Sequence, residues 1–258
     1  MFRKKKQNNL NHIIKVEDSH AEFAVIEAFN SLAVNLMYTM NGTGTKKVAL
    51  TSSIPHEGKS MISYNLASTF VQQGQRVLVI DTDMRCPTQQ KYFNCSRENG
   101  LSDVLCGLKT YDEVVKTAYS EEFKYISAGM HTPNPLRLLS SGALKELVES
   151  VESQFDYIIF DASPIGIVTD SLMLKDIVDG YIVVVDQTST KHPLLANSIS
   201  TLQHAGVEIL GVVINNFDYM TNEYIYSNRY SNKYNNYYVK ANNSDAVSDV
   251  TIGTVLDK

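Results

Sequence analysis

The sequence predicts an α/β fold, a doubly wound and mostly parallel sheet with helices on both faces. From residue 47 onward, short continuous runs of β-branched and other apolar residues recur, and such runs are typical of strands that are buried on both faces. Segments with helical periodicity separate these runs, and this alternation indicates parallel strands joined by helical crossovers. The 258 residues, 43% of them hydrophobic, suffice for one large domain with an appendage.

The N-terminal part precedes the predicted sheet. Residues 1–16 are polar and contain the basic tract Arg3–Lys6, so we expect a disordered basic terminus. Ser19 and Glu22 have the spacing of a capping box, which predicts that a helix opens there. Apolar residues then follow helical spacing, and Gly42 is expected to end the helix.

One predicted domain, residues 17–216, contains this helix and the whole sheet. Its predicted strands are residues 48–50, 77–80, 157–160, 181–185 and 209–214. The predicted helices between them are residues 60–73, 143–153 and 193–204. Ligands of such a sheet bind at the carboxyl ends of the strands, so we expect the site in the loops after the first three runs.

The composition changes abruptly after Phe217. Residues 217–258 contain no proline, one leucine and many Asn, Ser and Tyr residues, so they offer too little apolar surface to offset the entropy of ordering. A flexible tail is therefore predicted. Seven of the fifteen tyrosines fall in it: Tyr219, Tyr224, Tyr226, Tyr230, Tyr234, Tyr237 and Tyr238. A low-complexity segment, an RNA-stacking segment and a set of phosphate acceptors are the open interpretations.

Charge and composition exclude several classes of protein. The net charge of -5 provides no basic field, so we expect no nucleic acid as the main partner. No apolar run approaches the roughly 18 to 20 residues that cross a bilayer, and no secretory signal is visible, so a cytoplasmic protein is expected. Cys86, Cys95 and Cys106 lack the spacing of metal ligands and are expected to be free thiols.

Residues 51–60 connect a predicted strand to a predicted helix and end in Gly58-Lys59-Ser60. In a P-loop, backbone amides hold the phosphates, the lysine reaches the β and γ phosphates, and the hydroxyl binds Mg²⁺. Ser53 replaces the first glycine of the GxxxxGK[ST] pattern. The predicted nucleotide contacts of this segment are Ser53, His56, Glu57, Gly58, Lys59, Ser60 and Met61.

Carboxylates follow two other predicted strands. Asp161 ends an apolar run, as a Walker B aspartate does when it holds Mg²⁺. Asp81 and Asp83 end another run, and on an extended segment residues i and i+2 point to the same side. Arg85 follows them, so a surface turn with a structural Asp–Arg pair is the alternative. Three such strand ends in one sheet favour a nucleotide site.

Residues 20–240 resemble the bacterial tyrosine kinases, which are the capsule and exopolysaccharide autokinases built on a P-loop ATPase fold. Residues 53–60 resemble the Walker A segment of that family, and residues 81–88 resemble its distinctive second motif. Asp161 is similar to the residue that opens its Walker B segment, and residues 129–139 resemble a further stretch.

The resemblance implies a protein-tyrosine kinase that uses ATP and Mg²⁺. It implies catalytic roles for Lys59, Asp81, Asp83 and Asp161, and a metal site made of Ser60, Asp81 and Asp161. Arg85 is expected to contact a phosphate of the nucleotide or another subunit, and Asn215 matches a position that contacts adenine in related ATPases. Asp81 is the first choice for accepting the tyrosyl proton. The implied acceptors are Tyr224, Tyr226, Tyr230, Tyr234, Tyr237 and Tyr238, phosphorylated in trans.

The same resemblance implies partners and a location. A membrane adaptor of the polysaccharide chain-length regulator type is expected to activate the kinase and to hold it at the inner face of the membrane. Self-association and a cognate tyrosine phosphatase are also implied. The implied process is the synthesis and export of capsular polysaccharide or exopolysaccharide.

Two departures bear on the relatives. The alternatives to a kinase are a ParA-like or MinD-like ATPase switch and a catalytically weak nucleotide-binding scaffold. The ParA-like and MinD-like switches carry a lysine five positions before the P-loop lysine. Here that position is Ile54, so the charge-assisted contact of that class is missing. The kinases usually show ExxRxxR in the first helix, where this chain keeps Glu27 but has Asn30 and Ala33. A ring of subunits formed through those arginines is therefore not expected.

Overall fold

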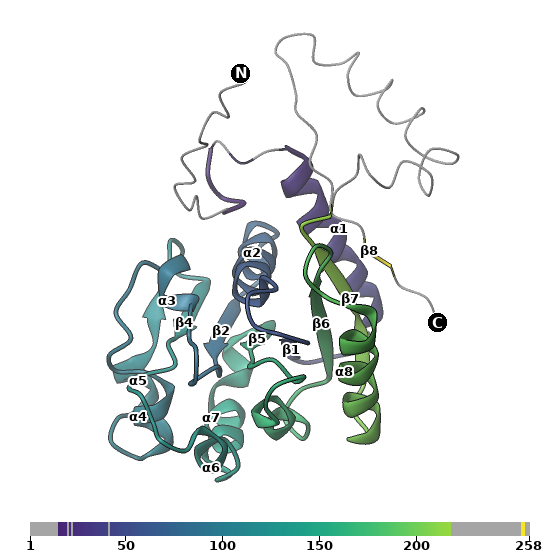
Figure 1. The fold of residues 1–258 in the computed structure, drawn as a ribbon. Coiled ribbons are helices and arrows are strands. Elements are labelled where there is room, and N and C mark those ends of the chain that lie inside the picture. Colours follow the sequence, from purple (N-terminus) through teal and green to yellow (C-terminus); the bar gives the residue numbers. More distant parts are fainter. Residues whose placement is uncertain (1–14, 20, 22, 41, 218–253, 256–258) are drawn as a thin grey trace, which may run out of the picture.

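The computed structural model describes residues 15–19, 21, 23–40, 42–217 and 254–255 (Figure 1). Within them the predicted α/β fold is confirmed. One sheet contains eight strands in the order β3-β4-β2-β5-β1-β6-β7-β8. The six inner strands are parallel, and the outer strands β3 and β8 pair antiparallel with their neighbours.

The predicted strands are all present, each a little longer than its apolar run. They are β1 (Lys46–Ser52), β2 (Val77–Asp81), β5 (Tyr157–Asp161), β6 (Gly180–Asp186) and β7 (Ile209–Asn215). The sequence did not predict β3 (Lys116–Thr117), β4 (Phe123–Ile126) or β8 (Thr254–Val255). The inner strand β4 is short, and the half-buried Lys124 interrupts its apolar residues, which hides the pattern of a buried strand.

Helices follow most strands. The longer ones are α1 (Phe23–Thr39), α2 (Lys59–Gln72), α7 (Ala143–Val151) and α8 (His192–His204). The short ones are α3 (Gln89–Tyr92), α4 (Leu101–Leu105), α5 (Tyr111–Val114), α6 (Pro135–Leu139) and the 3₁₀ helices η1 (Glu152–Gln154) and η2 (Asp170–Leu174). The predicted helix over residues 143–153 is therefore present as α7, and its last turn is the tighter 3₁₀ helix η1.

The start of the first helix differs from the prediction. The structure begins α1 at Phe23, so Ser19 is not its N-cap. Instead, the Asp18 carbonyl accepts a hydrogen bond from the Ala21 amide at 2.9 Å, which closes a turn before the helix. The helix ends before Gly42, as predicted, and Gly42 has a φ of 138° that favours glycine.

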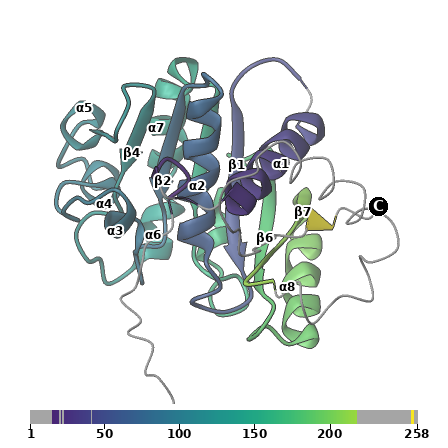
Figure 2. The same cartoon turned by 90° about the horizontal axis from the view of Figure 1, so that it is seen from above.

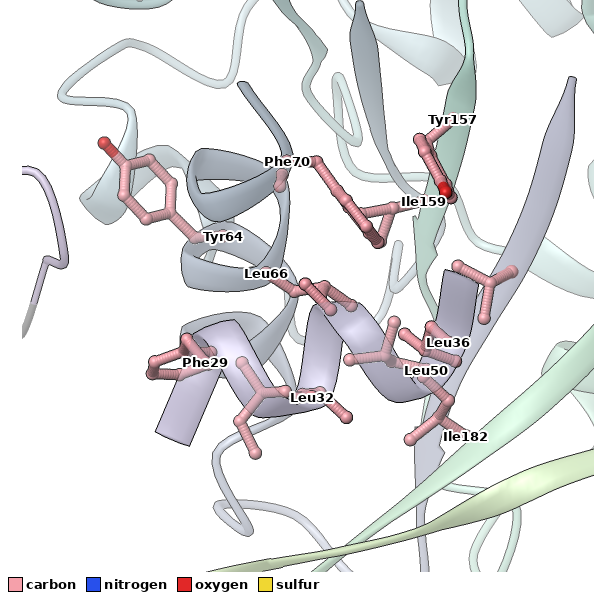
Figure 3. Close-up of a cluster of buried hydrophobic side chains, with 14 of the residues drawn as sticks. Phe29, Leu32, Leu36, Leu50, Tyr64, Leu66, Phe70, Tyr157, Ile159 and Ile182 are labelled. Carbon is pink, nitrogen blue, oxygen red and sulfur yellow. The ribbon is translucent and has the colours of Figure 1, made fainter. Parts of the chain in front are cut away.

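Two apolar cores lie on the two faces of the sheet. Strand residues alternate between them, so that Val48 and Leu50 face one core and Ala49 the other. α1 and α2 cover the first face, where they lie next to each other (Figures 1 and 2). In Figure 3 their side chains, Phe29 and Phe70 among them, meet the strand residues of this face. Side chains of α7, α8 and η2 belong to the second core.

None of the described helices is both long enough and apolar enough to cross a bilayer. The tyrosines of the predicted tail and the basic tract Arg3–Lys6 lie outside the described residues. Their predicted flexibility and roles stay predictions.

Candidate nucleotide site

The carboxyl ends of β1, β2 and β5 meet because these strands are neighbours in the sheet, in the order β2-β5-β1 (Figure 1). β1 leads into the loop that precedes α2, and β2 and β5 end in Asp81 and Asp161. These two aspartates are register partners on adjacent parallel strands. The three strand ends that the sequence singled out therefore converge at one edge of the sheet, as predicted.

The loop between β1 and α2 has the backbone of a phosphate-binding turn. Gly58 is the N-cap of the 14-residue helix α2, with a φ of 93° that L residues rarely adopt. The first amides of α2 have no helical partners and lie at the positive end of the helix dipole. A phosphate at this helix end would satisfy both.

Gly58 is also required by its neighbour. A Cβ at this position would come within 2.2 Å of Nδ2 of Asn215, which donates a hydrogen bond to the Glu57 carbonyl at 3.1 Å. The Glu57 side chain is buried, and its carboxylate accepts from the Ile54 amide at 2.7 Å and from the Thr190 hydroxyl. Thr190, which follows β6, and Asn215, which ends β7, therefore fix this loop through hydrogen bonds to Glu57.

Gly58→Ala is expected to lower the free energy of unfolding by about 3 kcal/mol, through a left-handed backbone plus the clash with Asn215. Gly74→Ala is the matched control, because Gly74 has a φ of 82° but no atom within 4 Å of its Cβ position. The control should cost only the backbone term, about 1 kcal/mol. Urea denaturation measures both. Equal losses would mean that the contact with Asn215 is unimportant.

A hydroxyl and a carboxylate face each other beside the P-loop lysine. The Ser60 hydroxyl donates to Oδ2 of Asp161 at 2.5 Å, and the Thr88 hydroxyl donates to Oγ of Ser60 at 2.5 Å. The side chain of Lys59 is almost buried, and among the described residues no carboxylate lies within ion-pair distance of its ammonium. This cation is therefore available to an added anion.

Asp81 and Asp161 are both buried, and each has an oxygen without a hydrogen-bond partner, Oδ2 of Asp81 and Oδ1 of Asp161. Burial raises the pKa of Asp161 to about 6, against the opposing effect of Lys59. Burial, followed by the charges of Asp161 and Asp83, raises the pKa of Asp81 well above its ordinary value. Ionisation of these two adjacent carboxylates is unfavourable without a nearby positive charge. A hard divalent cation such as Mg²⁺ would supply that charge, and it prefers oxygen ligands such as these carboxylates and the Ser60 hydroxyl.

A cavity of about 500 Å³ opens at these strand ends. Its lining includes His56, Gly58, Lys59, Ser60, Met61, Asp83 and Arg85 from the predicted site. Asp81 and Asp161 lie behind this lining. The remaining predicted contacts, Ser53, Glu57 and Asn215, are buried in or behind the loop and do not line the cavity.

Several residues of the site were not singled out from the sequence. Thr88 lies within the second motif and touches Ser60, and Gln89 donates to the Ser60 carbonyl at 3.1 Å. Because Thr88 belongs to the second motif and Gln89 follows it directly, their position beside the P-loop could have been suspected from that motif. Asp170 forms an ion pair with Arg85. The structural Asp–Arg pair considered for this segment therefore exists, but with a distant aspartate that no sequence spacing indicates.

The first helix shows where the two missing arginines would lie. Asn30 is half-buried and donates to the Glu27 carboxylate at 3.0 Å, and Ala33 is fully buried in the core that α1 shares with α2. The alanine therefore serves packing at this position.

The chain is similar to known proteins in its sequence and in its fold. The sequence model of the AAA domain matches residues 45–209. The chain is 34% identical over 219 residues to the putative tyrosine-protein kinase EpsB of Ralstonia solanacearum, which covers 85% of this chain and 29% of EpsB. It is 30% identical over 202 residues to the putative tyrosine-protein kinase CapB of Staphylococcus aureus, covering 78% of this chain and 89% of CapB.

Among solved structures, the kinase domain of Escherichia coli tyrosine kinase ETK superposes with a TM-score of 0.71 and 29% sequence identity, over 74% of each chain. The chain spans less than a third of the length of EpsB, but most of the length of CapB.

Proposed function

Because the chain belongs to the bacterial tyrosine-kinase family of P-loop ATPases, we propose that it transfers the γ-phosphoryl group of ATP to tyrosine hydroxyls. The observation that carries the proposal is the convergence of Lys59, Ser60, Asp81 and Asp161 at one cavity edge. Phosphoryl transfer needs little covalent chemistry from the protein, so alignment and charge suffice.

Each residue has a role that follows from its position. The Lys59 ammonium lines the cavity and neutralises charge on the β and γ phosphates. Ser60, Asp81 and Asp161 would hold Mg²⁺, and the ion would supply positive charge that offsets the negative charge of the phosphates. The amides at the start of α2 orient the phosphates.

The geometry supports Asp83, rather than Asp81, as the group that accepts the tyrosyl proton. Asp83 lines the cavity, whereas Asp81 is fully buried beside Asp161 and is better placed toward the metal. A carboxylate is a weak base toward a phenol with a pKa near 10, but the phenolic proton becomes acidic late in transfer. Asp83 would then act by orienting the hydroxyl and taking its proton.

The tail tyrosines are the proposed acceptors, in trans. Tethering gives them a high effective concentration at the site of an associated subunit. A membrane adaptor of the chain-length regulator type would hold the chain at the cytoplasmic face of the membrane, and a cognate phosphatase would reverse the modification. The names of EpsB and CapB describe tyrosine-protein kinases and support the kinase reaction.

The full chain should be incubated with MgATP, with and without the cytoplasmic segment of such an adaptor, and phosphate mapped by mass spectrometry. Phosphotyrosine within residues 219–238 is the expected result. ATP hydrolysis with unmodified tyrosines would instead indicate a MinD-like switch, although Ile54 lacks the cation of that class. A chain that binds no nucleotide would be a scaffold.

Phosphorylation of the tail is expected to loosen self-association. Each phosphate adds about -1.5 to -2 charges, so a fully modified tail repels itself and any acidic site that held it. A variant with all seven tail tyrosines replaced by phenylalanine should keep a larger assembly under MgATP, as measured by light scattering. The same size for both proteins would contradict this.

A further inference from the structure

Two loops line much of the cavity. The loop after β2 contributes Asp83, Arg85, Cys86 and Thr88, and the loop after β5 contributes Ser163, Pro164, Ile167 and Val168. Near the sheet, backbone hydrogen bonds join them, because the amides of Thr82 and Asp83 donate to the Asp161 carbonyl at 2.9 and 3.1 Å. Farther along the chain, one ion pair connects the first loop to the end of the second.

That ion pair joins Arg85 to Asp170, the first residue of η2. Nε of Arg85 lies 2.5 Å from Oδ2 of Asp170, and Nη2 lies 3.1 Å from Oδ1, so the guanidinium binds both oxygens. The Asp170 side chain is 3% exposed and the Arg85 side chain 42%. Leaving a buried carboxylate without the cation that pairs with it costs free energy, so breaking this ion pair is unfavourable.

Holding Arg85 fixes the turn that carries Asp83. Within this turn the Cys86 amide donates to Oδ1 of Asp83 at 3.1 Å, and Arg85 lies between the two. The Asp83 amide also donates to Oδ1 of Asp81 at 3.1 Å. The direction of the Asp83 carboxylate in the cavity therefore depends on where Asp170 places the guanidinium.

We propose that Asp170 is a positioning residue for the acceptor tyrosine, acting through Arg85 on the turn that presents Asp83. The proposal rests on the proposed kinase function. It assigns the Arg85 guanidinium to Asp170 rather than to the nucleotide phosphates. Loss of the pair should therefore impair the use of tyrosine and leave nucleotide binding intact.

The test uses Asp170→Asn in the full chain, with a peptide of residues 219–238 as acceptor. The KM for the peptide should rise and its kcat/KM should fall by about 10- to 100-fold, which is what small misplacements of a positioned group cost in rate, while the Kd for ADP stays within about twofold. Hydrogen exchange should accelerate at the Cys86 amide, which reports the turn independently of activity. Asp170→Glu, which retains the charge, should restore most of the peptide affinity.

The control is Asp156→Asn, because Asp156 and Arg76 form a second bidentate ion pair that is absent from the cavity lining. It should change neither KM nor exchange at Cys86. If Asp170→Asn does not fold, Arg85→Gln breaks the same pair from its exposed side.

An unchanged peptide KM, or a Kd for ADP that shifts by the same factor as KM, would overturn the positioning role. A wild-type chain that binds ADP but phosphorylates neither itself nor the peptide would overturn the proposed function, and with it the acceptor role of Asp170.

Discussion

Lys59→Met is expected to lower the rate of tyrosine phosphorylation by about a hundredfold to a thousandfold, while the fold is retained. The ammonium is nearly buried and lines the cavity, and no carboxylate among the described residues lies within ion-pair distance of it. A preorganised cation in such a site stabilises charge that develops in the transition state, and loss of one comparable donor costs about 10² to 10³ in rate. Methionine keeps most of the stem, so packing should change little.

The rate is measured as phosphotyrosine formed under saturating MgATP, and the fold by thermal denaturation. Lys145→Ala is the control, because Lys145 is an exposed lysine of α7 that pairs with Glu149 at 3.8 Å. This control should keep full activity. Activity of Lys59→Met within about tenfold of the wild type would mean that the P-loop lysine does not carry the reaction.

Much of this site could be predicted because its residues sit at the ends of strands that the sequence reveals. The apolar run before Asp81 and the one before Asp161 each identify a buried strand, and parallel strands present their carboxyl ends at one edge. Neighbouring strand order then makes the two aspartates register partners. The chemistry of the P-loop follows from Gly58-Lys59-Ser60 in the same way.

What could not be predicted depends on contacts between residues far apart in sequence. The partner of Arg85 is 85 positions away on a short 3₁₀ helix, and the brace behind Glu57 comes from Thr190, 133 positions away. Neither follows from periodicity or spacing, because tertiary packing alone brings these groups together. The proposal of Asp83 rather than Asp81 as the proton acceptor likewise required the structure. Both aspartates follow the same strand in the sequence and both are buried, but only Asp83 lines the cavity.

Asp161→Asn is expected to abolish phosphorylation and yet to stabilise the metal-free protein at neutral pH. The pKa of Asp161 is raised from 3.8 to about 6 because the carboxylate is buried, so its ionisation opposes folding. The folded state keeps the proton up to about pH 6, whereas the unfolded chain loses it near pH 4. The free energy of unfolding therefore falls as pH rises between these values, by about 2 to 3 kcal/mol.

Asparagine removes that cost because it is neutral at all pH values and can still accept the hydrogen bond of Ser60. At pH 7.5 without Mg²⁺, the variant should melt roughly 5 °C or more above the wild type, and this difference should vanish near pH 4. Addition of MgADP should reverse the order, since it stabilises the protein that binds it and the variant lacks a proposed metal ligand.

Asp156→Asn is the matched control, with the opposite sign. Arg76 lowers the pKa of Asp156, so its ionised form favours folding and the variant should not gain stability at pH 7.5. A lower melting temperature for metal-free Asp161→Asn would show that the carboxylate serves the fold. A higher one, coupled to lost phosphorylation, would show that this strand end retains an unfavourable charge because the metal requires it.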